Sequence, residues 1–132
     1  MFKFALVSGS PVNVGQMVEV AAGTANARGD VGQITTGSFA FSASACPGAV
    51  VSDIADGKAV AMILTPDVVV EAPVSGTDSQ IGALKAGAFI KFTQTGVDAS
   101  ATSAFCQIVD TNSAKTAGDK IYVRFVGGAE AT

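Results

Sequence analysis

The sequence predicts a mainly β protein: a small antiparallel β-sandwich or barrel with long Gly/Ala/Ser-rich loops and at most one short helix. Valine and isoleucine together number 24, against three leucines, and branched side chains favour strands over helices. Apolar residues repeatedly stand at every second position, which is the period of a half-buried strand. Turn residues separate these runs every eight to twelve positions, a spacing typical of sandwiches and barrels.

The expected strands can be placed in chain order. Alternating runs predict strands at FKFAL (2–6), MVEV (17–20), SFAFS (38–42), AFIKF (88–92) and KIYVRF (120–125). KAVAMIL (58–64) and DVVVEAP (67–73) are more uniformly apolar, as expected of strands covered on both faces. The best helical candidate is SQIGALKAG (79–87), which its glycines limit to a turn or two.

Three glycines precede expected strands in a similar way. Gly15, Gly87 and Gly118 each stand a few residues before alternating apolar positions. A phosphate-binding loop needs glycines that lead into a helix, whereas these lead into strands. We therefore expect these glycines to have a structural role, in which each supplies the positive φ of a tight turn.

Length and composition indicate one domain over residues 1–132, with residues 1–12 as an N-terminal arm or edge strand. A chain of 132 residues buries about two-thirds of the surface that it exposes when unfolded. Charged residues make up 14%, against about 25% in an ordinary soluble domain. This predicts that some surface lies against other copies of the chain or a partner; a larger core is the alternative.

Charge and residue types argue against several functions. The net charge is −3 and the eight basic residues are scattered, so neither nucleic acid nor a membrane surface is an expected partner. The start of the chain has one lysine, Lys3, and only four apolar residues between it and Ser8, too few for a signal-peptide core, and a cytoplasmic product is expected. The chain has no histidine, which removes Ser-His-Asp and Cys-His mechanisms. We expect no enzyme and no cofactor.

The motifs that invite a catalytic or binding interpretation each have a simpler one. IVDTN (108–112) resembles an aspartic protease loop, but Asn112 stands where that loop has glycine, and Asp110 is expected to cap a turn. Arg28-Gly29-Asp30 matches an integrin-binding tripeptide, and a turn is the favoured interpretation. A calcium ion between loops, held by Asp53, Asp56 and Asp78, is left open, although the spacing of a dedicated calcium loop is absent.

The two cysteines are expected to have different surroundings. Cys106 lies in AFCQIV, where a small buried side chain fits best, whereas Cys46 lies in a Ser/Ala/Gly-rich stretch and is expected to be more exposed. Two thiols without histidine do not complete a structural zinc site. A disulfide between them requires an oxidising compartment.

Three stretches resemble a known family. DGKAVAMIL (56–64), KAGAFIKF (85–92) and AGDKIYVRF (117–125) are similar to sequences of the head decoration, or capsid cement, proteins of tailed bacteriophages. The similarity covers roughly residues 50–126 and consists of strand and turn signatures. Family members often carry glycine where this chain has Ala61 or Met62.

The resemblance implies a structural virion protein. It implies a β-rich trimer that binds the outer capsid at threefold positions and stabilises the lattice of the major capsid protein after the shell has expanded. On this reading the alternating Phe2, Lys3 and Phe4 are candidates for a capsid or subunit contact; the alternative is that the phenylalanines face the domain's own core.

In a lone monomer, strand edges need protection by charged residues, for which Lys3, Glu19, Lys91 and Arg124 are available.

A second reading comes from a different class of protein. The chain is then a β-sandwich binding or adhesion module, such as a phage fibre or tail domain, with loops 24–30 and 74–80 at its tip. Substitution in those loops would abolish binding by such a module, whereas a decoration protein would lose binding on changes at its terminus or strand edges.

Overall fold

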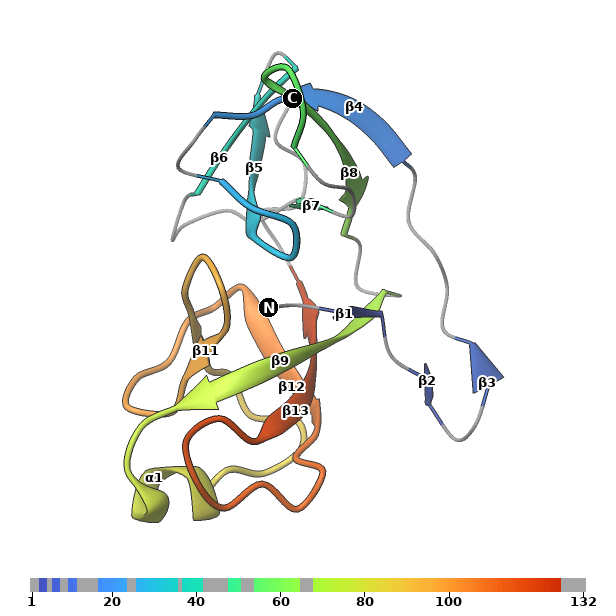
Figure 1. Ribbon diagram of the computed structural model, residues 1–132. Coiled ribbons are helices and arrows are strands. Elements are labelled where there is room, and N and C mark those ends of the chain that lie inside the picture. Colours follow the sequence, from blue (N-terminus) through green and yellow to red (C-terminus); the bar gives the residue numbers. More distant parts are fainter. Residues whose placement is uncertain are drawn as a thin grey trace.

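A computed structural model of the chain describes residues 3–4, 6–7, 10–11, 17–23, 26–35, 37–41, 48–50, 54–64 and 68–126. These residues form two curled sheets and one short helix (Figure 1). The fold class is therefore the mainly β class that the sequence predicts. No helix within the described ranges is long and apolar enough to cross a membrane.

The first curled sheet, called the barrel lobe, is a closed barrel of five strands. They are β4 (Met17–Ala21), β5 (Val31–Thr35), β6 (Ser38–Ala40), β7 (Gly48–Val50) and β8 (Lys58–Ile63), in the closed order β4-β6-β5-β7-β8. All neighbours run antiparallel except β4 and β6, which meet in a parallel pair at Ala21 and Ser38. Among the described residues, closure gives each of these five strands a neighbour on both sides.

Alternation in β4 and β6 fills the barrel. In β4, Val20 is buried and Glu19 is exposed, as the sequence predicts. The interior holds a cluster of small and aromatic side chains: Val20, Ala22, Phe39, Ala59 and Ala61. Gly32 permits close packing there, since a Cβ at this position would lie 2.7 Å from the backbone oxygen of Ala40.

The second curled sheet, called the sheet lobe, follows in the chain. Its elements are β9 (Val69–Ser75), α1 (Asp78–Gly82), β10 (Lys91–Phe92), β11 (Val97–Asp98), β12 (Cys106–Asp110) and β13 (Lys120–Phe125). The strand order is β10-β11-β9-β13-β12, and β1 (Lys3–Phe4) also pairs with β9. The two remaining strands, β2 (Leu6–Val7) and β3 (Ser10–Pro11), pair with each other.

The sheet lobe also curls back on itself. Gly87 N donates to Ile108 O at 2.8 Å and Ile108 N donates to Ala88 O at 2.8 Å. Ile90 N donates to Cys106 O at 3.0 Å. These bonds attach β12 to the segment that precedes β10, so the two ends of the strand order meet. The second sheet therefore resembles a small barrel as well.

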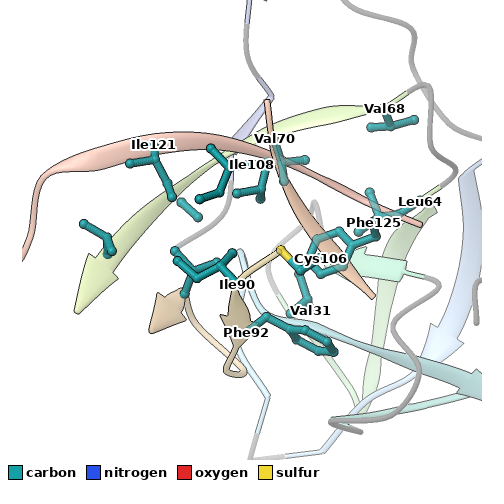
Figure 2. Close-up of a cluster of buried hydrophobic side chains, with 14 of the residues drawn as sticks. Val31, Leu64, Val68, Val70, Ile90, Phe92, Cys106, Ile108, Ile121 and Phe125 are labelled. Atoms are coloured by element: carbon teal, nitrogen blue, oxygen red, sulfur yellow. The ribbon is translucent and has the colours of Figure 1, made fainter. Parts of the chain in front are cut away.

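A large apolar cluster fills the sheet lobe and reaches into the barrel lobe (Figure 2). In β13 the inward positions Ile121, Val123 and Phe125 are buried while the residues between them are half-buried. Phe92 packs edge-on against Phe125, with ring centroids 5.3 Å apart. Val31 from β5 joins the same cluster, so the core is continuous between the lobes.

A polar contact joins the lobes beside this core. Gln94, in the turn between β10 and β11, accepts a hydrogen bond from Val31 N at 2.9 Å through its backbone oxygen. Its side-chain amide donates to Asp30 Oδ2 at 2.7 Å. Asp30 is 4% exposed. The tip of one hairpin in the sheet lobe is therefore fixed against the start of β5 in the barrel lobe.

The turn glycines and the short helix agree with the sequence predictions. Gly87 and Gly118 have φ of 90° and 95°, so both supply the positive φ expected before their strands; Gly15 lies outside the described residues. In α1, Thr77 and Gln80 form a capping box and Ile81 is buried. A helix of one turn thus closes the end of the sheet lobe.

Some finer expectations were wrong in whole or in part. β8 is covered on both faces at Ala61 and Met62, which are fully buried, but not at Val60, which is 38% exposed on the outside of the closed barrel. Phe41 does not share the burial of Phe39, because β6 ends at Ala40 and Phe41 is 37% exposed. Arg124 does not protect an edge, because β13 lies between β9 and β12. Glu19 pairs with Val60 of β8, and the other side of β4 meets β6 only at Ala21, so edge protection by Glu19 stays a prediction. Lys91, in the terminal strand β10, is exposed. The single domain over residues 1–132 stays a prediction.

Candidate interaction surfaces

The residues predicted to contact a capsid or a neighbouring subunit lie at the start of the chain. Phe2 is outside the described residues, and for Lys3 and Phe4 the structure gives the backbone alone. Lys3 and Phe4 form β1, which runs antiparallel to β9 with Lys3 opposite Glu71 and Phe4 opposite Val70. These two residues thus pair with a neighbouring strand, while the arm or edge strand over residues 1–12 and the contact itself stay predictions.

Large apolar side chains are exposed at three places in the described part of the chain. Phe41, Val60 and Phe89 have exposed fractions of 37%, 38% and 41%. The exposure of Phe89 has a signal in the sequence, because in AFIKF it shares a face with Lys91, opposite the buried Ile90 and Phe92. Val60 lies opposite Glu19 on the outside of the barrel.

Phe41 is exposed but held in place. Its ring packs edge-on against Phe92, with centroids 6.0 Å apart and planes at 74°. Phe92 is buried and packs in turn against Phe125. An aromatic chain therefore runs from the core of the sheet lobe to the surface. A rigid aromatic anchor of this kind suits a binding surface, because little side-chain entropy is left to lose.

The Arg28-Gly29-Asp30 tripeptide is a turn, as the sequence predicts. Gly29 has φ of 91°. The Asp30 carboxylate accepts hydrogen bonds from Ala27 N at 2.8 Å and from Gln94 Nε2 at 2.7 Å. Since Asp30 is buried, its carboxylate is not displayed to a receptor. The tripeptide holds the two lobes together instead.

Two further carboxylates, those of Asp110 and Asp119, also stabilise local turns. Asp110 Oδ1 accepts a hydrogen bond from Asn112 N at 2.7 Å, which confirms the turn expected after β12. Asp119 Oδ2 accepts from Lys115 N at 2.9 Å and from Thr116 N at 3.1 Å. These two backbone hydrogen bonds lower the pKa of Asp119 below its ordinary value.

A third carboxylate, on β11, behaves in the same way. Asp98 Oδ1 accepts from the Ser100 hydroxyl at 2.6 Å and from Ser100 N at 2.9 Å. The hydroxyl, then the backbone N–H, and to a lesser extent the Lys91 charge lower the pKa of Asp98. Lys91 stands directly opposite Asp98 in the β10–β11 ladder. Such carboxylates are stabilised as anions and are poorly suited to accept a proton near neutral pH.

A side-chain link ties β12, β13 and the Gly87 turn together. Arg124 donates to Gln107 Oε1 through Nε at 2.9 Å and through Nη2 at 2.7 Å. Gln107 Nε2 donates to Gly87 O at 3.0 Å. Arg124 is therefore engaged with its neighbouring strand in a structural role.

Cys106 is a free, buried thiol. Its burial raises its pKa to about 12, so the reactive thiolate is almost absent at neutral pH. The predicted role as a small buried side chain is confirmed; Cys46 lies outside the described residues. No cluster of three His, Cys, Asp or Glu side chains that fits a metal ion occurs in the described part. Asp56 and Asp78 are exposed there, and Asp53 is not described.

Comparison with known proteins identifies no relative of this chain. No protein-family profile, curated protein or solved structure matches this chain.

Proposed function

We propose that this chain is a decoration protein of a tailed-bacteriophage capsid. In this role it binds the outer surface of the shell as a homotrimer and stabilises the lattice of the major capsid protein. It is made in the host cytoplasm and located on the virion exterior. Neither a cofactor nor a catalytic step is part of the proposal.

One structural observation carries the proposal. Each of the three stretches that resemble decoration proteins contains a positive-φ turn that leads into strand structure. Asp56 and Gly57, with φ of 53° and 73°, lead into β8. Gly87 precedes the segment attached to β12, and Gly118 precedes β13. Turn-led strands of this kind support the proposal, because the resemblance over roughly residues 50–126 consists of strand and turn signatures.

The exposed apolar side chains supply a contact chemistry for this role. Phe41 and Phe89 are aromatic and more than a third exposed. Burying such a side chain completely is worth about 1.5–3 kcal/mol, and a lattice offers the same site many times. Modest contacts at each site can therefore add up to a stable coat through avidity.

The alternative, a binding or adhesion module, has less support from the geometry. Its first loop contributes the buried Asp30, which is bonded to the other lobe. Its second loop leads into α1, where Thr77 and Gln80 bond each other's backbone. Three side chains of these loops, Asp30, Thr77 and Gln80, thus serve internal structure, while Arg28 and Asp78 are exposed.

Co-sedimentation with DNA-free, expanded capsid shells of the encoding phage tests the proposal. The wild-type protein is expected to sediment with the shells at a fixed ratio to the major capsid protein. Phe89→Ser is expected to weaken binding about tenfold or more, while Lys85→Ser, an exposed polar change nearby, serves as its control. Binding that is abolished by Arg28→Ala or Asp78→Ala and unaffected by Phe89→Ser would favour the adhesion module. Absence of wild-type binding would overturn the proposal.

A further inference from the structure

β9 is bonded to β13 along one edge and to β1 and β11 along the other. Val74 N donates to Asp119 O at 2.9 Å, and Gly118 N donates to Val74 O at 2.8 Å. Because backbone groups alternate along a strand, residues 70, 72 and 74 face β13. Residues 71, 73 and 75 therefore face the outer edge. Ala99 N, next to β11, donates to Ser75 O at 2.9 Å on that edge.

Pro73 divides this outer edge into two parts. Proline has no N–H to donate to a neighbouring strand. The chain at Gly96 also packs tightly against it, since a Cβ at Gly96 would lie 2.6 Å from Pro73 O. β11 therefore occupies the part beyond Pro73, and β1 occupies the part that ends at Glu71. The second part, Val69–Glu71, is called the acceptor edge below.

β1 is a short addition to the acceptor edge. It pairs through two residues, Lys3 with Glu71 and Phe4 with Val70. The next two strands, β2 and β3, pair with each other and lie apart from both lobes in Figure 1. Among the described residues, β1, β2 and β3 are thus joined to the sheets of the two lobes by a single ladder, which consists of the two residue pairs between β1 and β9.

The register favours the chain's own N-terminal strand as the occupant. It places the cationic Lys3 directly opposite the anionic Glu71, and opposite charges on facing positions stabilise a strand pair. A second copy of the chain carries the same strand. A strand from that copy would make the same pairs, so exchange requires no new contact.

We propose that the acceptor edge is a strand-exchange site, at which Lys3–Phe4 of a second copy replaces the chain's own β1. Since both arrangements make the same pairs, their ratio depends on the concentration of other copies relative to the effective concentration of the attached strand. The effective concentration of a tethered strand is on the order of millimolar. Dilute protein keeps its own strand, and crowded copies exchange. That crowding occurs on a capsid rests on the proposed function; the exchange itself does not.

Cross-linking of mixed variants in solution, without capsids, tests the exchange. Lys3→Cys and Glu71→Cys are made singly, each with Cys46→Ser, and the two proteins are mixed and oxidised. Facing residues of a strand pair are close enough for a disulfide. Mass spectrometry is expected to show a disulfide that joins position 3 of one chain to position 71 of another, with a yield that rises steeply toward millimolar protein. Lys3→Cys mixed with Lys85→Cys is the control, because Lys85 lies outside the acceptor edge.

The double variant Lys3→Cys/Glu71→Cys, also with Cys46→Ser, completes the design. At micromolar concentration it is expected to close within one chain. The proposal would be overturned if the double variant closes within one chain but the mixed single variants give no interchain disulfide above the control at several millimolar. That result would show that β1 stays with its own chain. Failure to close within the chain would overturn it as well, because β1 would then not occupy the acceptor edge. Neither result depends on capsid binding.

Discussion

Asp30 and Gln94 are 64 positions apart in the chain and are joined side chain to side chain, with Gln94 Nε2 donating to Asp30 Oδ2 at 2.7 Å. The same oxygen accepts from Ala27 N at 2.8 Å. One buried carboxylate thus shapes the turn before β5 and fixes the β10–β11 hairpin against it. The next residue, Val31, belongs to the larger apolar cluster.

Removal of this carboxylate should destabilise the protein. Asp30→Ala leaves Ala27 N and the Gln94 amide without this acceptor, which should cost about 1–3 kcal/mol of unfolding free energy. Asp30→Asn keeps an oxygen for both donors and should cost less. Urea unfolding measures both. A loss of less than about 0.5 kcal/mol for Asp30→Ala would contradict the role given to this residue.

The turn before β13 should require glycine. Gly118 has φ of 95°, and a Cβ there would meet nothing within 4 Å. The cost of Gly118→Ala therefore comes from the backbone, and it should be about 1–2 kcal/mol. Gly82→Ala is the control, since Gly82 also has open space but has no positive φ. It should be neutral or stabilise α1 slightly. Equal effects of the two variants in thermal unfolding would refute the argument.

Close packing of Gly96 on Pro73 predicts a steric effect. A Cβ at Gly96 would lie 2.6 Å from the backbone oxygen of Pro73, so Gly96→Ala should cost about 1–3 kcal/mol as the chain shifts. A Cβ at Gly23 would have nothing within 4 Å, and Gly23 has no positive φ, so Gly23→Ala should be neutral or slightly stabilising. Denaturant unfolding compares the two, and a neutral Gly96→Ala would be the contrary result.

Acid should weaken the loop before β13. Backbone hydrogen bonds from Lys115 and Thr116 lower the pKa of Asp119 in the folded protein. Its contribution to stability is therefore present above the unfolded pKa of about 4, and it is lost as pH falls through the folded pKa. Asp119→Asn should flatten the dependence of melting temperature on pH below about 4. Parallel curves for the two proteins would count against this assignment.

Cys106 should be unreactive in the folded protein. Burial raises its pKa to about 12, so in a Cys46→Ser background a thiol reagent at a pH of about 8 should react only when the protein unfolds. Labelling followed by mass spectrometry, with and without denaturant, measures this. Cys106→Ser should also cost about 1–3 kcal/mol, because it places a hydroxyl in an apolar cluster. Rapid labelling of native protein would be inconsistent with the burial described.

The sequence predicted the local features well, because they depend on neighbouring residues. Alternation in KIYVRF places Ile121, Val123 and Phe125 inside, and this is how β13 is buried. Gly87 and Gly118 have the expected positive φ, and Asp110 accepts the expected turn hydrogen bond. Each of these outcomes follows from the period of a strand or from the conformational range of one residue.

Strand pairing and the contact between lobes were not predictable in the same way. Alternation says which side of a strand is buried but not which strand is its neighbour, so neither barrel closure nor the link from Gln94 to Asp30 follows from it. Val60 stands in an apolar run and is nevertheless 38% exposed, whereas Met62, two positions later on the same face of β8, is fully buried in the larger apolar cluster. The exposure of Phe41 depends on β6 ending one residue earlier.

The proposed role of this chain is to strengthen a capsid from outside, and the sharpest test of that role is the melting temperature of the shell. Expanded, DNA-free shells of the encoding phage are heated in a calorimeter alone and after saturation with the purified protein. With the protein bound, the transition of the shell is expected to shift to higher temperature, since a ligand that binds the assembled state alone stabilises it. A shell transition that is unchanged at saturating protein would rule out the proposed role.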